Sequence, residues 1–261
     1  MTIFKHELRQ GRNALLIWTA AISFMLGVCV LIYPEMSAQM GDVGGMFAEM
    51  GSFSAAFGMD RINFGEFIGF FGVECGNVLG LGGAFFAALL GISALAKEEK
   101  EHTAEFLLTH PVSRQEVIAG KLCAVIAQII ILNVVVIGVT ALSVLAIGEE
   151  APVRTLGLLF FAYLLMQLET AAVTFGISAF LKRGGMGIGI GLAAVFYFMN
   201  IIANLIQETK FLKFITPFGY AEGADIISDN AVNGGYLAVG MIFAVLGIAA
   251  AFWRYGGKDI A

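Results

Sequence analysis

The chain has 261 residues, of which 59% are hydrophobic and 13% are charged, and its mean hydropathy is +0.86. Soluble domains are about 45–50% apolar and about 25% charged, so this composition excludes an ordinary soluble domain. It indicates an integral membrane protein whose surroundings are the lipid bilayer. The formal net charge of −5 provides no overall basic field, so nucleic acid is not expected as a partner.

Six apolar runs are long enough to cross the roughly 30 Å of bilayer hydrocarbon, which takes about 20 helical residues. They predict an all-α membrane protein in which residues 1–261 form a single transmembrane domain. All four prolines lie outside these runs, where a missing N–H does least harm. The second run is too long for one unkinked span, and its outer part is a candidate for a separate interfacial piece. The runs are Ala14–Tyr33, about Ile68–Ala96, Leu122–Ile147, Leu156–Leu181, Met186–Ile206 and Tyr236–Tyr255.

The distribution of Lys and Arg predicts the orientation, because cytoplasmic loops carry an excess of these residues. With the N-terminus inside, eleven of the fifteen fall in cytoplasmic segments and both termini are cytoplasmic. We therefore expect a multi-pass protein of the cytoplasmic membrane with both termini inside. The expected host cell is bacterial. The first dozen residues, Met1–Arg12, mix apolar and basic side chains and predict a short helix on the inner leaflet, with a frayed terminus as the alternative.

The most informative stretch is Lys97–Lys121, which predicts two helices joined by a tight break. Thr103 is a candidate N-cap of a short helix with Glu105 near the positive end of its dipole, and Pro111 ends that helix. Ser113 then starts a capping box with Glu116, in which each side chain bonds the backbone amide of the other residue. The next helix therefore begins in the cytoplasm and runs into the membrane as a rigid lever.

The short helix carries an apolar knob, Phe106, Leu107 and Leu108, which must be buried in lipid headgroups or in another protein. In this stretch the chain resembles the permease subunits of type-2 ATP-binding-cassette transporters. Their loop reads approximately acidic pair, Thr, acid, Leu-Leu, Ser or Thr, any residue, Pro-Val-Ser-Arg, often with Gly where this chain has His102. The matching residues are Glu98, Glu99, Thr103, Glu105, Leu107, Leu108, Thr109, Pro111, Val112, Ser113 and Arg114.

The resemblance implies that Thr103–His110 is a coupling helix, which docks in a groove of a separate ATPase subunit. ATP and Mg²⁺ would be bound by that partner, since no GxxxxGK[ST] motif occurs in this chain. We expect the permease to be no enzyme, to hold no cofactor, to export its cargo, and to work as a dimer with a second copy or a paralogue. The implied docking residues are Glu98, Glu99, Thr103, Glu105, Phe106, Leu107, Leu108, Pro111 and Arg114.

Two acidic residues within the spans are candidates for the translocation pathway. Glu169 lies near the middle of the fourth span, where an ionisable group costs roughly a few kcal/mol unless it is paired, protonated or facing water. It either lines a cavity or the dimer seam, or is protonated and bonded to a neighbouring helix. Glu74 lies nearer the outer surface and is either solvated or part of the substrate route. The three cysteines show no close pairing and support neither a metal site nor a disulfide.

The expected function is therefore a permease subunit of an ATP-driven exporter. The main alternative is an ATP-independent channel or secondary transporter, although no convincing inverted repeat is visible. An intramembrane protease is disfavoured, because its candidate motifs at 149–154 and 106–110 fall on opposite membrane faces and no HExxH motif occurs. The loops and the apolar interior fit lipids, peptides or hydrophobic drugs, and equally sodium or a cell-surface precursor.

Overall fold

The computed structural model describes residues 2–39, 51–63, 65–100, 113–181 and 185–256, and every regular element in this part of the chain is helical. Six helical stretches are long and apolar enough to cross a membrane, which confirms an all-α fold with six candidate spans. The elements are α1 (Thr2–Gln39), α3 (Ser52–Ala56), α4 (Phe67–Cys75), the π-helix η1 (Gly76–Leu81), α5 (Gly82–Lys100), α7 (Arg114–Ile147), α8 (Val153–Ser178), α9 (Met186–Leu205), the 3₁₀ helices η2 (Gln207–Phe214) and η3 (Pro217–Gly219), α10 (Gly223–Asp229) and α11 (Gly234–Gly256).

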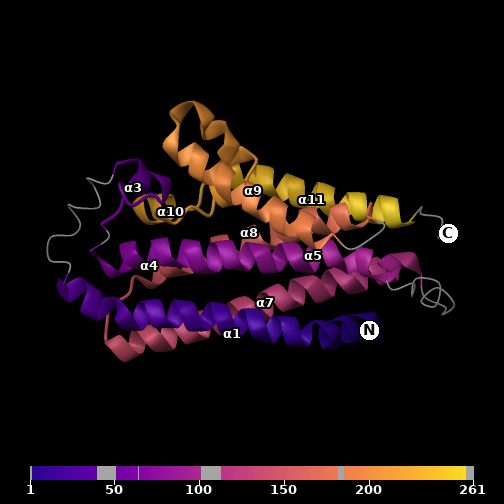
Figure 1. The fold of residues 1–261 in the computed structure, drawn as a ribbon, viewed down its shortest axis with the longest axis horizontal. Helices are drawn as coiled ribbons and strands as arrows, with labels where there is room; N and C mark the ends of the chain where they lie inside the picture. Colours follow the sequence, from indigo (N-terminus) through magenta and orange to yellow (C-terminus); the bar gives the residue numbers. More distant parts are fainter. Residues whose placement is uncertain (1, 40–50, 64, 101–112, 182–184, 257–261) are drawn as a thin grey trace.

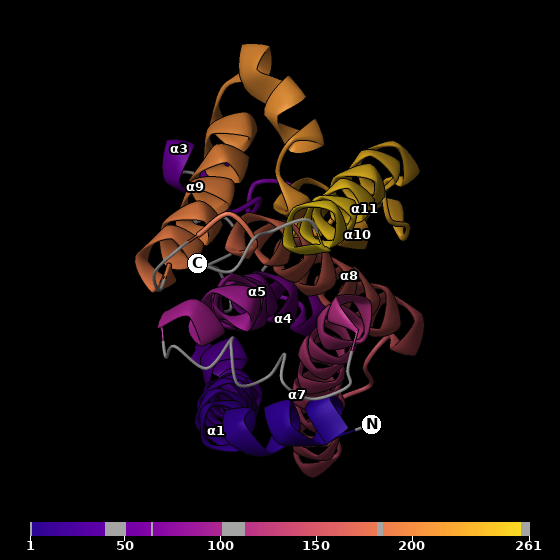
Figure 2. The ribbon, with the colours of Figure 1, turned by 90° about the vertical axis from the view of Figure 1, so that its right-hand side faces the viewer.

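The spans pack in three layers, which Figure 2 shows end-on: α1 beside α7, the α4–α5 stretch beside α8, and then α9 and α11. The α4–α5 stretch is the middle of the bundle, with 61% of its apolar window buried, against 11% for α11. The start of α1 and the end of α11 lie at one end of the bundle, together with the end of α5 (Figure 1). We call this the N/C end, and the opposite end, which carries α3 and α10, the loop end.

The second span is one continuous helical stretch, so the separate interfacial piece considered from the sequence is not present. α4 passes through η1 into α5, and a π-turn of this kind takes up an extra residue without ending the helix. The glycines of this stretch allow a close approach to α8. A Cβ built on Gly76 or on Gly80 would lie 3.1 Å from Tyr163.

The first helix is longer than its apolar run at both ends, and it includes Pro34, which the sequence had placed outside the span. Tertiary contacts hold this turn: the Tyr33 hydroxyl donates to the Gly65 carbonyl at 3.0 Å, and its ring packs against Phe67 and Phe70. Residues 2–12 belong to the same helix, and Figure 2 shows these first turns crossing the N/C end toward α7. Their placement on a membrane surface stays a prediction.

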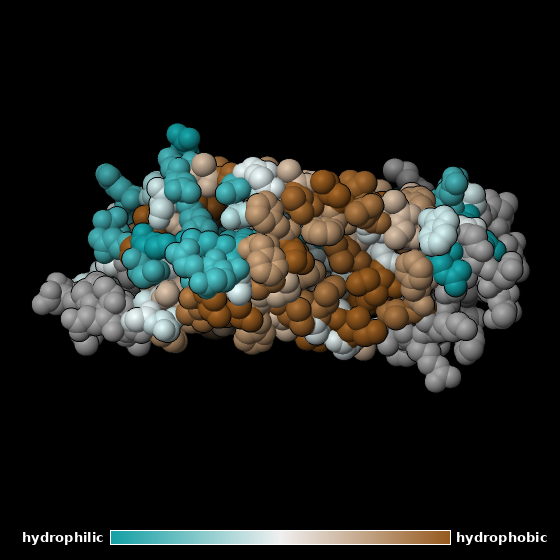
Figure 3. Space-filling model, turned by 90° about the horizontal axis from the view of Figure 1, so that it is seen from above, coloured by the Kyte–Doolittle hydropathy of each residue, from teal (hydrophilic) through white to brown (hydrophobic). Residues whose placement is uncertain are grey.

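The face formed by α9 and α11 carries a broad apolar band between two hydrophilic ends, as Figure 3 shows. Soluble monomers rarely expose an apolar patch of this extent, and a band of this kind is typical of a surface that bilayer hydrocarbon covers. Its exposed side chains include Ile188, Val195, Phe198, Ile242, Val245 and Leu246.

α8 and α11 approach each other backbone to backbone. A Cβ built on Gly176 would lie 2.5 Å from the carbonyl oxygen of Gly247, and a Cβ on Gly247 would lie 2.5 Å from that of Ala172. Small residues at a crossing let membrane helices gain van der Waals contact that larger side chains would prevent. These two glycines therefore set the distance at which the third layer packs on the second.

We expect Gly176→Val to lower the thermal unfolding temperature of the detergent-purified protein, because the added methyl groups would separate α8 from α11. Overpacking of this kind typically costs about 1–3 kcal/mol. Gly138→Val on α7 is the matched control, since a Cβ there meets no atom within 4 Å. Equal unfolding temperatures for the two variants would contradict the close crossing.

Candidate functional site

The segment that the sequence assigns to ATPase docking falls largely outside the described residues. Thr103, Glu105, the knob of residues 106–108 and Pro111 lie there, whereas Glu98 and Glu99 lie in the last turn of α5. The structure does describe what the segment connects: α5 ends at Lys100, and α7 begins directly after Ser113. Both positions are at the N/C end, so a force applied to the segment would act there.

The predicted capping box is confirmed. The backbone N–H of Glu116 donates to Ser113 Oγ at 3.2 Å, and the backbone N–H of Ser113 donates to Glu116 Oε2 at 3.0 Å. The box satisfies two amides that a helix N-terminus otherwise leaves unpaired. α7 therefore starts at a defined residue and continues unbroken for 34 residues to Ile147, as the sequence predicts; its action as a lever stays a prediction.

One turn further along, α7 is joined to α1 by a buried ion pair. Lys121 Nζ donates to Glu7 Oε1 at 2.8 Å, and the Lys121 side chain is only 2% exposed. Beside it, a Cβ built on Gly120 would lie 3.2 Å from Ile3 Cγ2, so the first turns of α1 rest directly on α7. A buried ammonium group is costly unless it is paired, and this pairing therefore holds the two helices in one register.

The same turns of α7 also contact α5, α8 and α11. Ile118 is fully buried in a cluster with Leu95, Phe175 and Ala251, one residue from each of these helices. Arg114 Nη1 donates to the Gly256 carbonyl oxygen, the last residue of α11, at 3.4 Å. The α7 start, residues 113–121, thus touches four other helices, and a displacement of it would reach all of them.

Glu169 is enclosed within a single chain. Its Oε2 accepts a 2.8 Å hydrogen bond from the Tyr220 hydroxyl, and a Cβ on Gly240 of α11 would lie 2.3 Å from the same oxygen. Tyr220 lies in the connection before α10, where burial and then the neighbouring carboxylate raise the pKa of its phenol, so the hydroxyl remains a donor. Of the two interpretations of Glu169, the geometry favours the carboxyl group bonded to a neighbouring element; its role in the pathway stays a prediction.

Glu74, the second acidic candidate, is half-buried on α4. Cys29 of α1 points its thiol at Glu74 Oε2 at a sulfur–oxygen distance of 3.7 Å. This contact ties the loop-end half of α1 to the middle layer. The structure thus gives Glu74 and Glu169 different partners, and a part for Glu74 in the substrate route stays a prediction as well.

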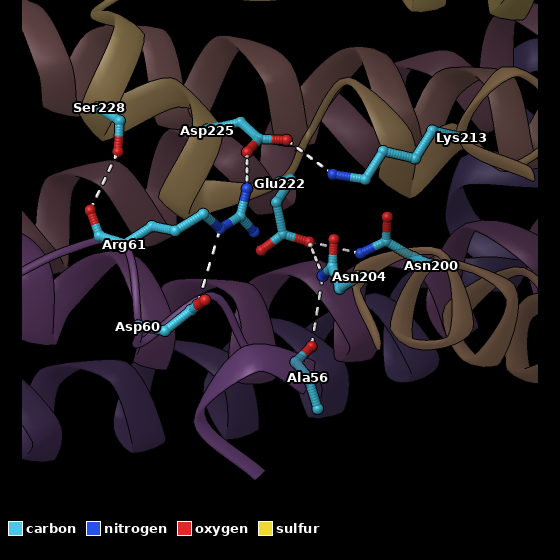
Figure 4. Close-up of polar contacts among 9 residues, drawn as sticks. All are labelled: Ala56, Asp60, Arg61, Asn200, Asn204, Lys213, Glu222, Asp225 and Ser228. Atoms are coloured by element: carbon cyan, nitrogen blue, oxygen red, sulfur yellow. Dashed lines mark hydrogen bonds and ion pairs between the residues drawn. The ribbon is translucent and has the colours of Figure 1, made fainter. Parts of the chain in front are cut away.

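A polar network at the loop end was not foreseen from the sequence, and Figure 4 shows its members. Asp225 of α10 accepts from Lys213 at 2.7 Å and also pairs with Arg61, which precedes α4. The Lys213 side chain is 7% exposed, so its charge depends on this carboxylate, whereas the Arg61 pair is more open to solvent. The network joins two connections that lie far apart along the chain, the one before α4 and the one between α9 and α11.

Glu222 lies beside this network and bonds to α9. Its Oε2 accepts from the side-chain amides of Asn200 and Asn204, one helical turn apart, and the Asn204 amide also donates to the Ala56 carbonyl at 3.3 Å. The i, i+4 spacing of these two asparagines in an otherwise apolar span was the available sequence signal. No local pattern indicated that their partner would be residue 222.

A small polar cavity lies beside this network. It has a volume of about 40 Å³ and is lined by η1, α8, α9 and the start of α10. The Tyr163 hydroxyl and Asn200 Oδ1 are buried there without a hydrogen-bond partner among the described residues. A space of at least about 10–15 Å³ with several polar neighbours suits an ordered water, and the cavity between the middle layer and α10 meets both conditions.

We expect Asp225→Asn to destabilise the loop end by about 1–3 kcal/mol, because it removes the carboxylate that neutralises buried Lys213; the partial exposure of Asp225 keeps the value below that of a fully buried pair. The measurement is thermal unfolding of the purified protein. Asp229→Asn, at an exposed position of the same helix, should leave the unfolding temperature unchanged. Identical behaviour of both variants would exclude a stabilising role for the network.

The comparison with known families agrees with this architecture. Residues 1–260 match the sequence model of a family described as ABC-2 family transporter protein. No curated protein gives a significant match to the chain. The family match extends over nearly the whole sequence, including all six candidate spans and the segment between α5 and α7. The chain therefore belongs to the ABC-2 transporter family and is a multi-pass permease of an ATP-binding-cassette transporter.

Proposed function

We propose that this permease is one subunit of an exporter, that it forms the translocation pathway as a dimer with a second copy or a paralogue, and that a separate ATPase subunit drives it through the segment around residues 103–110. The observation that supports this best is the α7 start. Residues 113–121 follow the docking segment directly and contact α1, α5, α8 and α11. A push on the segment therefore has a defined mechanical route into the bundle.

The route runs along α7. Its capped N-terminus prevents fraying, so a displacement at Ser113 tilts the helix as a body instead of unwinding its first turn. The Glu7–Lys121 pair links α1 to α7, so α1 would move together with α7. The hydrogen bond from Arg114 to Gly256 would couple the same movement to the end of α11. Within the span itself, the Glu169–Tyr220 bond connects α8 to the segment before α10.

In this proposal ATP and Mg²⁺ are bound by the partner subunit, and the permease catalyses no reaction. The distribution of Lys and Arg supports a cytoplasmic N/C end in the bacterial cytoplasmic membrane, and the family resemblance supports export. An ATP-independent channel or secondary transporter is the alternative. Membership of an ABC family favours the ATP-driven function, because permeases of such transporters are powered by ATPase subunits.

We expect the double substitution Phe106→Asp and Leu107→Asp to abolish copurification of the ATPase with the affinity-tagged permease, because two charges would replace the apolar surface that enters its groove. Membrane insertion should be unchanged. Phe53→Asp introduces the same kind of charge at an exposed phenylalanine of α3, at the loop end, and should leave copurification intact. Retention of the ATPase by the double variant would overturn the docking assignment.

The mechanical route has its own test in the Glu7–Lys121 pair. Glu7→Gln should lower the unfolding temperature, because it removes a carboxylate that pairs with the buried Lys121 ammonium group; the cost should stay below the about 3–5 kcal/mol of a fully broken buried pair. Adding Lys121→Met should recover part of the lost stability, since it removes the ammonium group whose pairing the first substitution weakens. This double variant should still bind the ATPase yet show reduced ATPase activity in the purified complex, because α1 is no longer tied to α7. Unaltered activity would argue against transmission through this pair.

A further inference from the structure

An apolar groove runs between α8 and α11 in the half of the bundle near the N/C end. It has a volume of about 490 Å³, and side chains from both helices line it. Pockets that hold small ligands fall in the range of about 300–1,000 Å³. On the α8 side it is bounded by Val173 and Phe180, and on the α11 side by Phe243, Leu246 and Ala250.

The groove exists because of the glycine crossing. Gly176 and Gly247 bring the two backbones into contact and form its floor, while larger side chains on either side of the crossing form its walls. Phe180 is 50% exposed and Leu246 is 58% exposed, so the groove opens toward the surface that hydrocarbon covers. Its shape and apolar lining suit a flexible hydrocarbon chain.

The positively charged side chain of Arg254 lies at the N/C end of the groove. The guanidinium carbon of Arg254 lies 5.9 Å from the centre of the Phe180 ring, which is itself part of the lining. The neighbouring Trp253 is 77% exposed, as expected of an indole at the boundary between hydrocarbon and headgroups. A guanidinium group at this depth has the fork geometry that binds phosphate oxygens, and basic positions between membrane helices recognise anionic headgroups.

We propose that this groove binds an acyl chain of an anionic phospholipid from the leaflet on the side of the two termini, with the lipid phosphate at Arg254. Charge complementarity favours this ligand, because an apolar groove that ends at the Arg254 guanidinium group matches a molecule with a hydrocarbon tail and an anionic headgroup. A second copy of the chain would bring another apolar helix to the groove and leave the cation unmatched. The inference does not depend on the ATPase partner; only the name of the leaflet, cytoplasmic, rests on the proposed orientation.

The test uses the fluorescence of Trp253 in the full-length chain. The only other tryptophan, Trp18, lies on α1 and can be replaced by Phe. The protein is reconstituted into phosphatidylcholine vesicles that contain a minor fraction of phosphatidylglycerol, with brominated acyl chains on one lipid or the other. Brominated phosphatidylglycerol should quench Trp253 more strongly than an equal fraction of brominated phosphatidylcholine. Equal quenching by the two lipids would overturn the proposal.

Variants separate the headgroup from the chain. Arg254→Gln should weaken the apparent affinity for phosphatidylglycerol about five- to tenfold and remove the preference for it, whereas Arg154→Gln, on the first turn of α8 at the loop end, should not. Ala250→Phe fills the groove and should reduce the extra quenching, while Ala249→Phe, on the adjacent exposed face of α11, should not.

Inorganic phosphate should not compete with phosphatidylglycerol for the groove. Competition by phosphate would mean a simple anion site, and loss of self-association in Ala250→Phe would mean that a second copy covers the groove; either result contradicts the lipid assignment.

Discussion

The arrangement of this permease depends on a buried ion pair at the start of α7. Lys121 is almost completely shielded from solvent, and Glu7, more than a hundred residues earlier, is a carboxylate that pairs with it. An ammonium group in a region of low dielectric constant requires such partners, so sliding α1 relative to α7 would break this contact at a cost in free energy. The pair therefore links the two helices of the outer layer close to the start of α7.

Each end of the molecule contains an ion pair between a buried lysine and a carboxylate, but the two pairs join different elements. At the N/C end the pair joins two spans directly, whereas at the loop end Asp225 joins Lys213 and Arg61 from separate connections. Glu222 then fastens this region to α9 through two asparagine amides (Figure 4). Among the described residues the middle of the bundle is joined by uncharged contacts as well, such as the Asn133–Gln167 hydrogen bond between α7 and α8, whereas the ion pairs lie at the two ends.

Close packing between α8 and α11 has two consequences. The glycine crossing brings the backbones of α8 and α11 into direct contact, between the Gly240–Glu169 contact on one side and the Phe175–Ala251 cluster on the other. The same crossing leaves space between the flanking larger side chains, which is the groove that we assign to a phospholipid. A movement transmitted to α11 through Arg114 and Gly256 would pass close to this groove, so a bound lipid would lie next to the moving parts.

The sequence by itself determined the six spans and the family, because a bilayer requires long apolar helices whatever their packing, and it determined the Ser113–Glu116 cap, because that contact is local. The tertiary structure alone decided that the second span is continuous, that Pro34 lies inside α1, and which distant polar groups meet, as in the Glu7–Lys121 pair. The physical reason lies in the composition of the spans. Apolar side chains cover both the lipid-facing and the buried faces of such helices, so hydrophobic periodicity does not indicate which face packs against which neighbour.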